Sequence, residues 1–154
     1  MSLQRALIKA LVFVMFASVI AVAADNQPSI TQSDLITASQ LKSHLPAVKD
    51  GKIVLIHVGF HVMYQMGHIP GSQYVGAASY ADGMAALKRL VSELPRGQEI
   101  VIYCGCCPWD NCPNIQPAFH TLKEMGFTDL KALDIPKRFG DDWTAKGYPT
   151  VKGE

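Results

Sequence analysis

The sequence predicts an α/β fold in which a mainly parallel central sheet is flanked by helices. Two nearly continuous apolar runs, residues 53–58 and 99–103, are typical of strands that are buried on both faces, as parallel strands are. Between them, residues 82–94 carry apolar side chains at the spacing of an amphipathic helix. Strands that alternate with helices favour a parallel sheet, and ligands of such sheets usually bind beyond the carboxyl ends of the strands.

Residues 1–24 form a separate segment with the composition of a signal peptide. Arg5 and Lys9 precede an uncharged apolar block, residues 11–24, which ends in small residues that suit a signal peptidase. The block is shorter than the roughly 20 residues that a membrane-spanning helix needs. We therefore expect a periplasmic or secreted protein, which contacts a membrane only if this segment stays uncleaved.

The remaining composition is that of one globular domain with no electrostatic bias. The chain of 154 residues is 49% hydrophobic and 18% charged, and its formal net charge is +1. Because so small a charge creates no strongly positive surface, we expect no nucleic-acid partner. Residues 25–33 are polar and are interpreted as a linker, and residues 34–154 as the domain.

The first elements of the domain are predicted from a cap and a proline. Thr37 and Gln40 have the spacing of a capping box, which predicts a helix over 38–45 that Pro46 ends. Strand 53–58 follows. Turn residues at 67–71 then precede a short strand candidate at 73–75.

The second half repeats the alternation of strand and helix. After helix 82–94, strand 99–103 runs directly into a proline-containing loop. A helix that ends at Gly126 comes next. Residues 130–133 then form a last short strand, and residues 136–146 are expected to contain one more helix.

All four cysteines lie in the loop that follows strand 99–103. They are Cys104, Cys106, Cys107 and Cys112. Cys112 lies at or just before the start of the next helix, where free backbone amides and the helix dipole favour a thiolate. Because no Lys or Arg occurs between Arg96 and Lys123, such stabilisation must come from backbone amides. In an exported protein these thiols must be paired, bound to metal or kept reduced for a purpose.

These features resemble the single-domain rhodaneses, a family of sulfurtransferases, over nearly all of residues 34–154. The resemblance rests on Gly-His-Ile-Pro-Gly at 67–71, on Val-Ile-Tyr-Cys at 101–104, and on the segments 124–127 and 143–149. It implies a rhodanese-like fold, no cofactor, and Cys104 as the nucleophile that accepts a sulfane sulfur as a persulfide. The partners implied are a small sulfur-containing substrate and a thiol acceptor.

The resemblance also implies that the loop after Cys104 binds the substrate. Its candidate binding residues are Gly105, Pro108, Trp109, Asp110, Asn111 and Asn114. Trp109 either lines the mouth of the pocket or covers the core of the loop. The loop is longer than is usual in the family, and Asn114 stands where an Arg is usual. Because that cation is missing, we expect low activity with thiosulfate.

Other polar residues of the framework have simpler interpretations. His57 and Gly59 replace the Asp and Arg usual at the end of the second strand, so we expect no ion pair there. His57 and His61 do not converge as metal ligands, because His57 closes a strand. His68 is expected to bond to backbone. Arg138, in the segment after the last strand, either turns toward a ligand or, as is more common for such residues, is only solvated.

Three functions remain open at the sequence level. The first is an exported sulfurtransferase in which Cys106, Cys107 or Cys112 resolves the Cys104 persulfide as a disulfide. The second is a thiol redox protein that cycles Cys107 and Cys112 between dithiol and disulfide. The third is a thiolate module that binds Cu(I) or Zn(II) and is not an enzyme. The spacing lacks two separated Cys-x2-Cys pairs, so no residue is assigned as a metal ligand.

Overall fold

A computed structural model describes residues 29–153 of the chain. The expected signal peptide, residues 1–24, and the first part of the expected linker lie outside this range. Within it, no helix is both long enough and apolar enough to cross a membrane.

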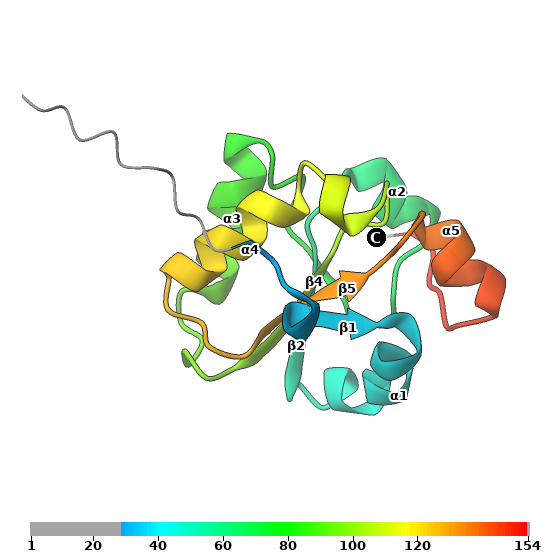
Figure 1. The fold of residues 1–154 in the computed structure, drawn as a ribbon, viewed down its shortest axis with the longest axis horizontal. Coiled ribbons are helices and arrows are strands. Elements are labelled where there is room, and N and C mark those ends of the chain that lie inside the picture. Colours follow the sequence, from blue (N-terminus) through cyan, green and yellow to red (C-terminus); the bar gives the residue numbers. More distant parts are fainter. Residues whose placement is uncertain (1–28, 154) are drawn as a thin grey trace, which may run out of the picture.

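Five parallel strands form the central sheet, in the order β1-β5-β4-β2-β3 (Figure 1). The strands are β1 (Leu35–Thr37), β2 (Ile53–His57), β3 (Gln73–Tyr74), β4 (Glu99–Tyr103) and β5 (Leu130–Asp134). This sheet confirms the predicted α/β class. Strand β1 was not predicted, because three residues are too short for a recognisable pattern.

Helices cover both faces of the sheet (Figure 1). The helices are α1 (Ala38–Lys49), α2 (His61–Met66), α3 (Ala81–Val91), α4 (Ile115–Glu124) and α5 (Phe139–Asp142). Apolar side chains of α3 and α4 share one core with the sheet, and those of α1 and α5 share a second core on the opposite face. The fold therefore has three layers.

Strand β4 is the central strand, and its side chains alternate between the two cores. Ile100 and Ile102 belong to the core under α3 and α4, whereas Val101 and Tyr103 belong to the core under α1. Cys104 continues this alternation and joins the core under α3 and α4. The end of β4 thus directs the Cys104 sulfur toward the start of α4.

Helix α1 begins as predicted but does not end at Pro46. The capping box is present, since the Thr37 amide donates to Gln40 Oε1 at 2.9 Å and the Gln40 amide donates to Thr37 Oγ1 at 3.3 Å. The helix continues through Pro46 to Lys49. Proline removes one amide donor, but its carbonyl still accepts the Asp50 amide at 3.0 Å, and Val48 beyond it is buried. Packing of this last turn outweighs the missing hydrogen bond.

The C-terminal region, predicted as one helix, is divided into two short pieces. Helix α5 ends at Asp142, and a 3-10 turn, Thr144–Lys146, follows the fully buried Trp143. Trp143 Nε1 donates to the carbonyl of Pro149 at 2.8 Å. Burial of this ring in the core under α1 determines the path of the tail.

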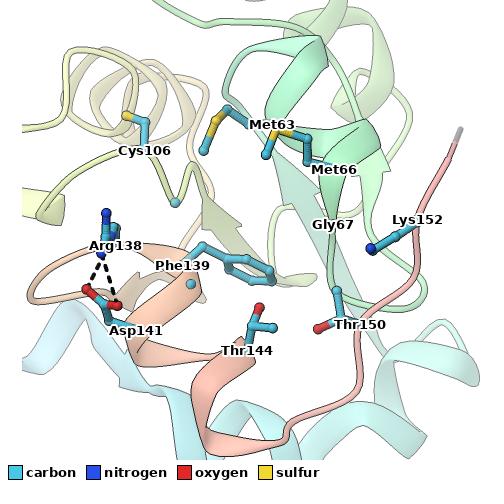
Figure 2. A pocket seen from close by; sticks show the side chains of 12 residues that line it. Met63, Met66, Gly67, Cys106, Arg138, Phe139, Asp141, Thr144, Thr150 and Lys152 are labelled. Atoms are coloured by element: carbon cyan, nitrogen blue, oxygen red, sulfur yellow. Dashed lines mark hydrogen bonds and ion pairs between the residues drawn. The ribbon is translucent and has the colours of Figure 1, made fainter.

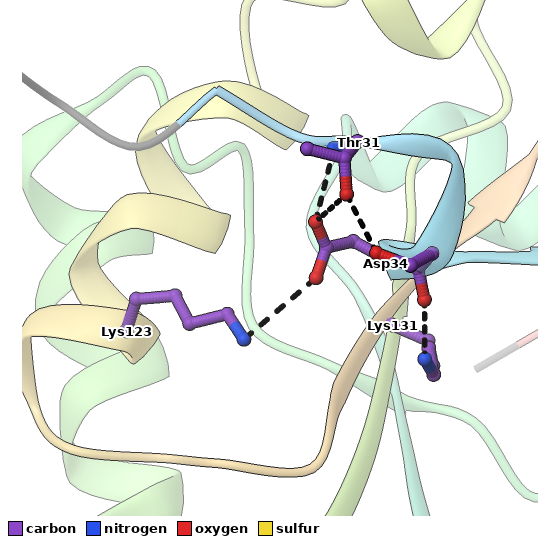
Figure 3. Close-up of polar contacts among 5 residues, drawn as sticks. Thr31, Asp34, Lys123 and Lys131 are labelled. Carbon is purple, nitrogen blue, oxygen red and sulfur yellow. Dashed lines mark hydrogen bonds and ion pairs between the residues drawn. The ribbon is translucent and has the colours of Figure 1, made fainter.

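The last part of the segment interpreted as a linker is packed onto the domain (Figure 3). Ile30 is buried in the core under α3 and α4. The Thr31 amide and hydroxyl both donate to the Asp34 carboxylate, which also lies 3.8 Å from Lys123 Nζ. The packed part of the chain therefore begins by Ile30, a few residues before Asp34.

Candidate active site

The cysteine loop leaves the carboxyl end of β4 and is held against the segment that follows β5. The Trp109 amide donates to the carbonyl of Ile135 at 3.1 Å, and the Phe139 amide donates to the carbonyl of Gly105 at 3.0 Å. Gly105 has a φ of +82°, and a Cβ there would lie 2.8 Å from the Cβ of Phe139. Glycine is therefore required at the first turn of the loop.

Three of the four cysteine sulfur atoms converge at one point. The Sγ atoms of Cys104, Cys106 and Cys112 all lie within 4.8 Å of one another. Cys106 Sγ lies 3.3 Å from Cys104 Sγ and 3.7 Å from Cys112 Sγ. Cys107 Sγ contacts Cys106 Sγ at 3.0 Å but lies outside the convergent group. All four side chains are free thiols in this structure.

Asn114, in the position where the family usually has Arg, contacts the proposed nucleophile directly. Its Nδ2 donates to Cys104 Sγ at 3.4 Å, and its Oδ1 accepts the Ser79 amide at 3.0 Å. Although Asn114 is the residue before α4, its side chain makes no cap hydrogen bond to the helix. Both polar atoms of this fully buried side chain are therefore used in hydrogen bonds, and one of these bonds holds the Cys104 sulfur.

Cys112 takes over the capping role at the start of α4. Contact with the Cys104 thiol is the main factor that lowers the pKa of Cys112, to about 5. Burial opposes this shift, and the backbone amides of Asn114 and Ile115 reinforce it. The same contact, together with burial, raises the pKa of Cys104. The two sulfurs therefore titrate as a coupled pair, and their contact favours a single negative charge between them.

Backbone from the end of β2 packs closely against the Cys104 sulfur. A Cβ at Gly59 would lie 2.7 Å from Cys104 Sγ and 2.9 Å from His57 Cε1. The Gly59 amide donates to His57 Nδ1 at 3.3 Å. Where an Asp and an Arg are usual in the family, this chain therefore has a buried imidazole and a close approach of backbone to sulfur.

His57 is held uncharged by its surroundings. It is 1% exposed, and burial is the main factor that lowers its pKa to about 4. A backbone hydrogen bond with Cys104 opposes this shift, and His68 adds to it. At neutral pH the ring therefore supplies no positive charge to the cysteine cluster.

His68 and Tyr103 form the framework below the site. His68 Nδ1 hydrogen-bonds to the carbonyl of Tyr64 at 2.9 Å, so its expected contact with backbone is confirmed. Tyr103 Oη accepts the Ile69 amide at 3.0 Å and contacts Ser72 Oγ at 2.9 Å. These contacts attach the Gly-His-Ile-Pro-Gly turn to the end of β4.

A pocket of about 460 Å³ opens beside the cysteine cluster (Figure 2). Cys106 is the one cysteine among its lining residues, and Met63, Met66 and Phe139 supply much of its apolar wall. Arg138 also lines it, and its Nε lies 2.9 Å from the carboxylate of Asp141. A small molecule in this pocket would contact Cys106 directly. Cys104 does not line the pocket, but its Sγ lies 3.3 Å from Cys106 Sγ.

The predicted binding loop is brought together only in part. Gly105 lines the pocket and Asn114 contacts Cys104, but Pro108, Trp109, Asp110 and Asn111 do not line that pocket. Trp109 packs, half-buried, against the core under α3 and α4, which is the second of its two interpretations. Asp110 and Asn111 are exposed and contact each other.

Several residues of the site carried no signal in the sequence. They are Met63, Met66, Ser79 and Phe139. Each lies in a segment far from the cysteine loop along the chain, and nothing in its own neighbourhood indicates the contact. Gly59 was noted as a departure from the family, but its role against Cys104 appears only in three dimensions.

Fold and site together define a class: an α/β domain with a cysteine at the carboxyl end of its central parallel strand. The family model of the rhodanese-like domain matches residues 37–134. The chain therefore belongs to the rhodanese-like domain family, as the resemblance implied.

One known protein is similar in sequence to most of this chain. The HTH-type transcriptional regulator Rv0324 of Mycobacterium tuberculosis is 34% identical over 120 residues, which are 78% of this chain and 46% of that protein. The chain thus spans less than half the length of this relative.

Solved structures share the fold. The rhodanese-like domain of the Alr3790 protein from Anabaena sp. has a TM-score of 0.56 at 21% identity, covering 78% of this chain and 80% of that chain. The BH2092 protein from Bacillus halodurans has a TM-score of 0.58 at 17% identity, covering 78% and 77%. A complex of EanB with hercynine has a TM-score of 0.53 at 23% identity, covering 76% of this chain and 27% of that chain.

The rhodanese-like domain and its clustered cysteines support a sulfurtransferase-like or related function.

Proposed function

We propose that this protein is a sulfurtransferase that carries sulfane sulfur as a persulfide on Cys104. The observation that carries the proposal is the position of the Cys104 sulfur, at the carboxyl end of β4 and 3.4 Å from the Asn114 amide. That donor stabilises negative charge on sulfur as it develops. The thiol of Cys106, 3.3 Å away, provides a second reactive group.

In the first half-reaction, Cys104 Sγ bonds to the terminal sulfur of a donor R–S–SH. The S–S bond of the donor breaks and R–SH leaves, so that Cys104 carries S–SH and no net oxidation occurs. The Cys104 proton passes to the neighbouring sulfur of Cys112, which returns it to the leaving thiolate. The contact between the two side chains, whose sulfurs lie within 4.8 Å of each other, supports this role for Cys112.

In the second half-reaction, an acceptor thiol R'–SH takes the terminal sulfur and leaves as R'–S–SH, which restores the Cys104 thiol. Where no acceptor is present, Cys106 resolves the persulfide. Cys106 Sγ then bonds to Cys104 Sγ, the outer S–S bond breaks, and hydrogen sulfide leaves. The resulting disulfide is reduced by an external dithiol, which is itself oxidised.

The charges around the site favour a donor of low charge over thiosulfate. Asn114 supplies a neutral amide where an Arg is usual, and His57 is uncharged at neutral pH. Of the two cations that line the pocket, Arg138 is already paired with Asp141, and the other is Lys152. A thiosulfate dianion at Cys104 would therefore lose hydration beside a neutral amide and an uncharged imidazole, whereas the apolar wall of the pocket suits an organic persulfide.

The same proposal includes export. Arg5, Lys9 and the apolar block at 11–24 direct the chain to the periplasm or the cell exterior. There, sulfur transfer needs a reducing partner, because free thiols do not persist in an oxidising compartment.

Intact-protein mass spectrometry tests the proposal. The reduced protein is mixed with an organic persulfide, and addition of one sulfur atom is followed. The Cys104→Ser protein takes up no sulfur, whereas Cys107→Ser, a matched substitution outside the convergent group, takes it up at the normal rate. Normal uptake by Cys104→Ser would show that another sulfur is the nucleophile.

A further inference from the structure

The three converging sulfur atoms have the arrangement of a metal site that the sulfur-transfer proposal does not use. Two ligands bound at about 2.3 Å, a typical zinc–sulfur bond, lie about 4 Å apart in trigonal or tetrahedral geometry. The Sγ atoms of Cys104, Cys106 and Cys112 are separated by distances from 3.3 Å to at most 4.8 Å. Small side-chain rotations therefore suffice to place all three around one ion.

The surroundings of the three sulfurs suit bound thiolates. Cys104 and Cys112 are each 2% exposed, so water does not compete for an ion held between them. Asn114 Nδ2 donates to Cys104 Sγ, and backbone amides at the start of α4 donate to Cys112 Sγ. Such hydrogen bonds orient thiolate ligands and compensate their charge.

The number and kind of ligands favour Cu(I). Structural zinc almost always takes four ligands in a tetrahedron, whereas three sulfurs converge here. Within residues 29–153, no histidine or carboxylate joins them in the convergent group. Soft sulfur ligands select Cu(I), and two thioethers, those of Met63 and Met66, line the pocket at the same end as Cys106 (Figure 2).

We propose that Cys104, Cys106 and Cys112 bind one Cu(I) ion, which reaches them through the pocket along Met63 and Met66. Cys106 connects the pocket to the two buried sulfurs, because it is half-buried, lines the pocket and contacts both of them. This activity is distinct from sulfur transfer but uses the same Cys104 sulfur. Bound Cu(I) therefore excludes the persulfide, and the protein functions either as a sulfur carrier or as a copper-binding module.

An anaerobic titration tests the site. Fully reduced protein competes for Cu(I) with a coloured Cu(I) chelator, and X-ray absorption of the loaded protein counts the sulfur ligands. We expect one Cu(I) per chain with three sulfur neighbours. Affinity in Cys106→Ser should fall by at least about 100-fold, beyond the 10–100-fold typical of losing an outer-shell partner. Cys107→Ser, the matched control, should keep the ion.

Three results would overturn the copper site: failure to compete with the chelator, equal affinity in Cys106→Ser, or tighter binding of Zn(II) than of Cu(I). Circular dichroism and thermal unfolding of each variant separate loss of ligand from loss of fold. Persulfide formation is measured on copper-free protein, so the two proposals fail independently. A last arm mixes copper-loaded protein with the persulfide donor; no uptake is expected, and normal uptake with copper retained would refute mutual exclusion.

Discussion

Asn114 holds the sulfur of Cys104 through its side-chain amide while its carbonyl accepts the backbone amide of Ser79. The residue thereby connects the loop before α3 to the end of β4. A neutral amide in this position orients the sulfur and stabilises partial negative charge on it, but it cannot attract a dianion as a guanidinium would.

Substitution of Asn114 by Ala should slow persulfide formation and destabilise the fold. The variant loses the donor to Cys104 Sγ and leaves the Ser79 amide without this acceptor, which costs about 1 kcal/mol of unfolding free energy. Stopped-flow kinetics with a persulfide donor and urea unfolding measure the two effects. Asn111→Ala, in the same loop but exposed, is the control and should change neither. Equal rates in both variants would contradict the role of Asn114.

Substitution of Gly59 by Ala should displace the Cys104 sulfur. The new Cβ would lie 2.7 Å from Cys104 Sγ, well inside van der Waals contact. Overpacking of this kind costs about 1–3 kcal/mol, and misplacement of the nucleophile lowers the rate of sulfur uptake by about 10-fold or more. Uptake is followed by mass spectrometry. Gly97→Ala, where a Cβ meets nothing within 4 Å, should behave as the parent protein.

Substitution of Cys106 by Ser should separate the two half-reactions. Sulfur uptake by Cys104 continues, because its contact with Asn114 is unchanged, but release of hydrogen sulfide without an acceptor thiol stops. The persulfide therefore accumulates, as a labelled sulfur donor and a sulfide electrode would show. Cys107→Ser should still release sulfide. If Cys107→Ser alone blocks release, the resolving cysteine has been misassigned.

Protonation of His57 should destabilise the fold in acid. The ring lies among three aromatic rings, those of Tyr64, Tyr74 and Tyr103, at centroid distances of 5.3, 5.9 and 4.9 Å. His68, the backbone of Cys104 and the Gly59 amide are its other polar neighbours. None of these groups supplies a negative charge to pair with an imidazolium.

The pH range of this effect follows from the two pKa values. In the unfolded chain His57 binds a proton below its ordinary pKa of 6.5, whereas in the folded protein its ring stays unprotonated down to about pH 4. Stability is therefore complete above about pH 6.5 and falls as the pH drops toward 4, by up to about 3 kcal/mol. Denaturant unfolding across this range should show a shallower slope in His57→Gln, while His44→Gln, which alters an exposed ring, keeps the original slope.

Export should remove the N-terminal segment. Cleavage is expected after Ala23 or Ala24, because small residues close the apolar block there. Mass spectrometry of the protein expressed with its full leader gives the mature N-terminus, and fractionation gives its compartment. A chain that begins at Met1 and sediments with membranes would contradict a cleaved leader.

The alternation of buried strands and amphipathic helices was readable in the sequence because its cause is local. Residues 53–57 and 99–103 are nearly all apolar, as expected of strands that are covered on both faces. Thr37 with Gln40 defines a helix start by hydrogen bonds within one turn. The place of Cys104 at the end of the central strand follows from the same pattern. The end of α1 was not predictable from this pattern, because burial of Val48 stabilises a last helical turn beyond Pro46.

The contacts that make the cysteine loop a site depend on tertiary structure. The path of the loop decides whether the sulfur atoms converge. This path is held by hydrogen bonds between the loop and two residues that follow β5, Ile135 and Phe139. The partner of Asn114 is Ser79, 35 residues earlier in the chain. Cys104 packs against Gly59 because the parallel sheet brings the ends of β2 and β4 together. The sequence alone identified the four cysteines as the candidate reactive groups. The packing of distant segments decided which of them touch, because a contact energy depends on distance in space and not along the chain.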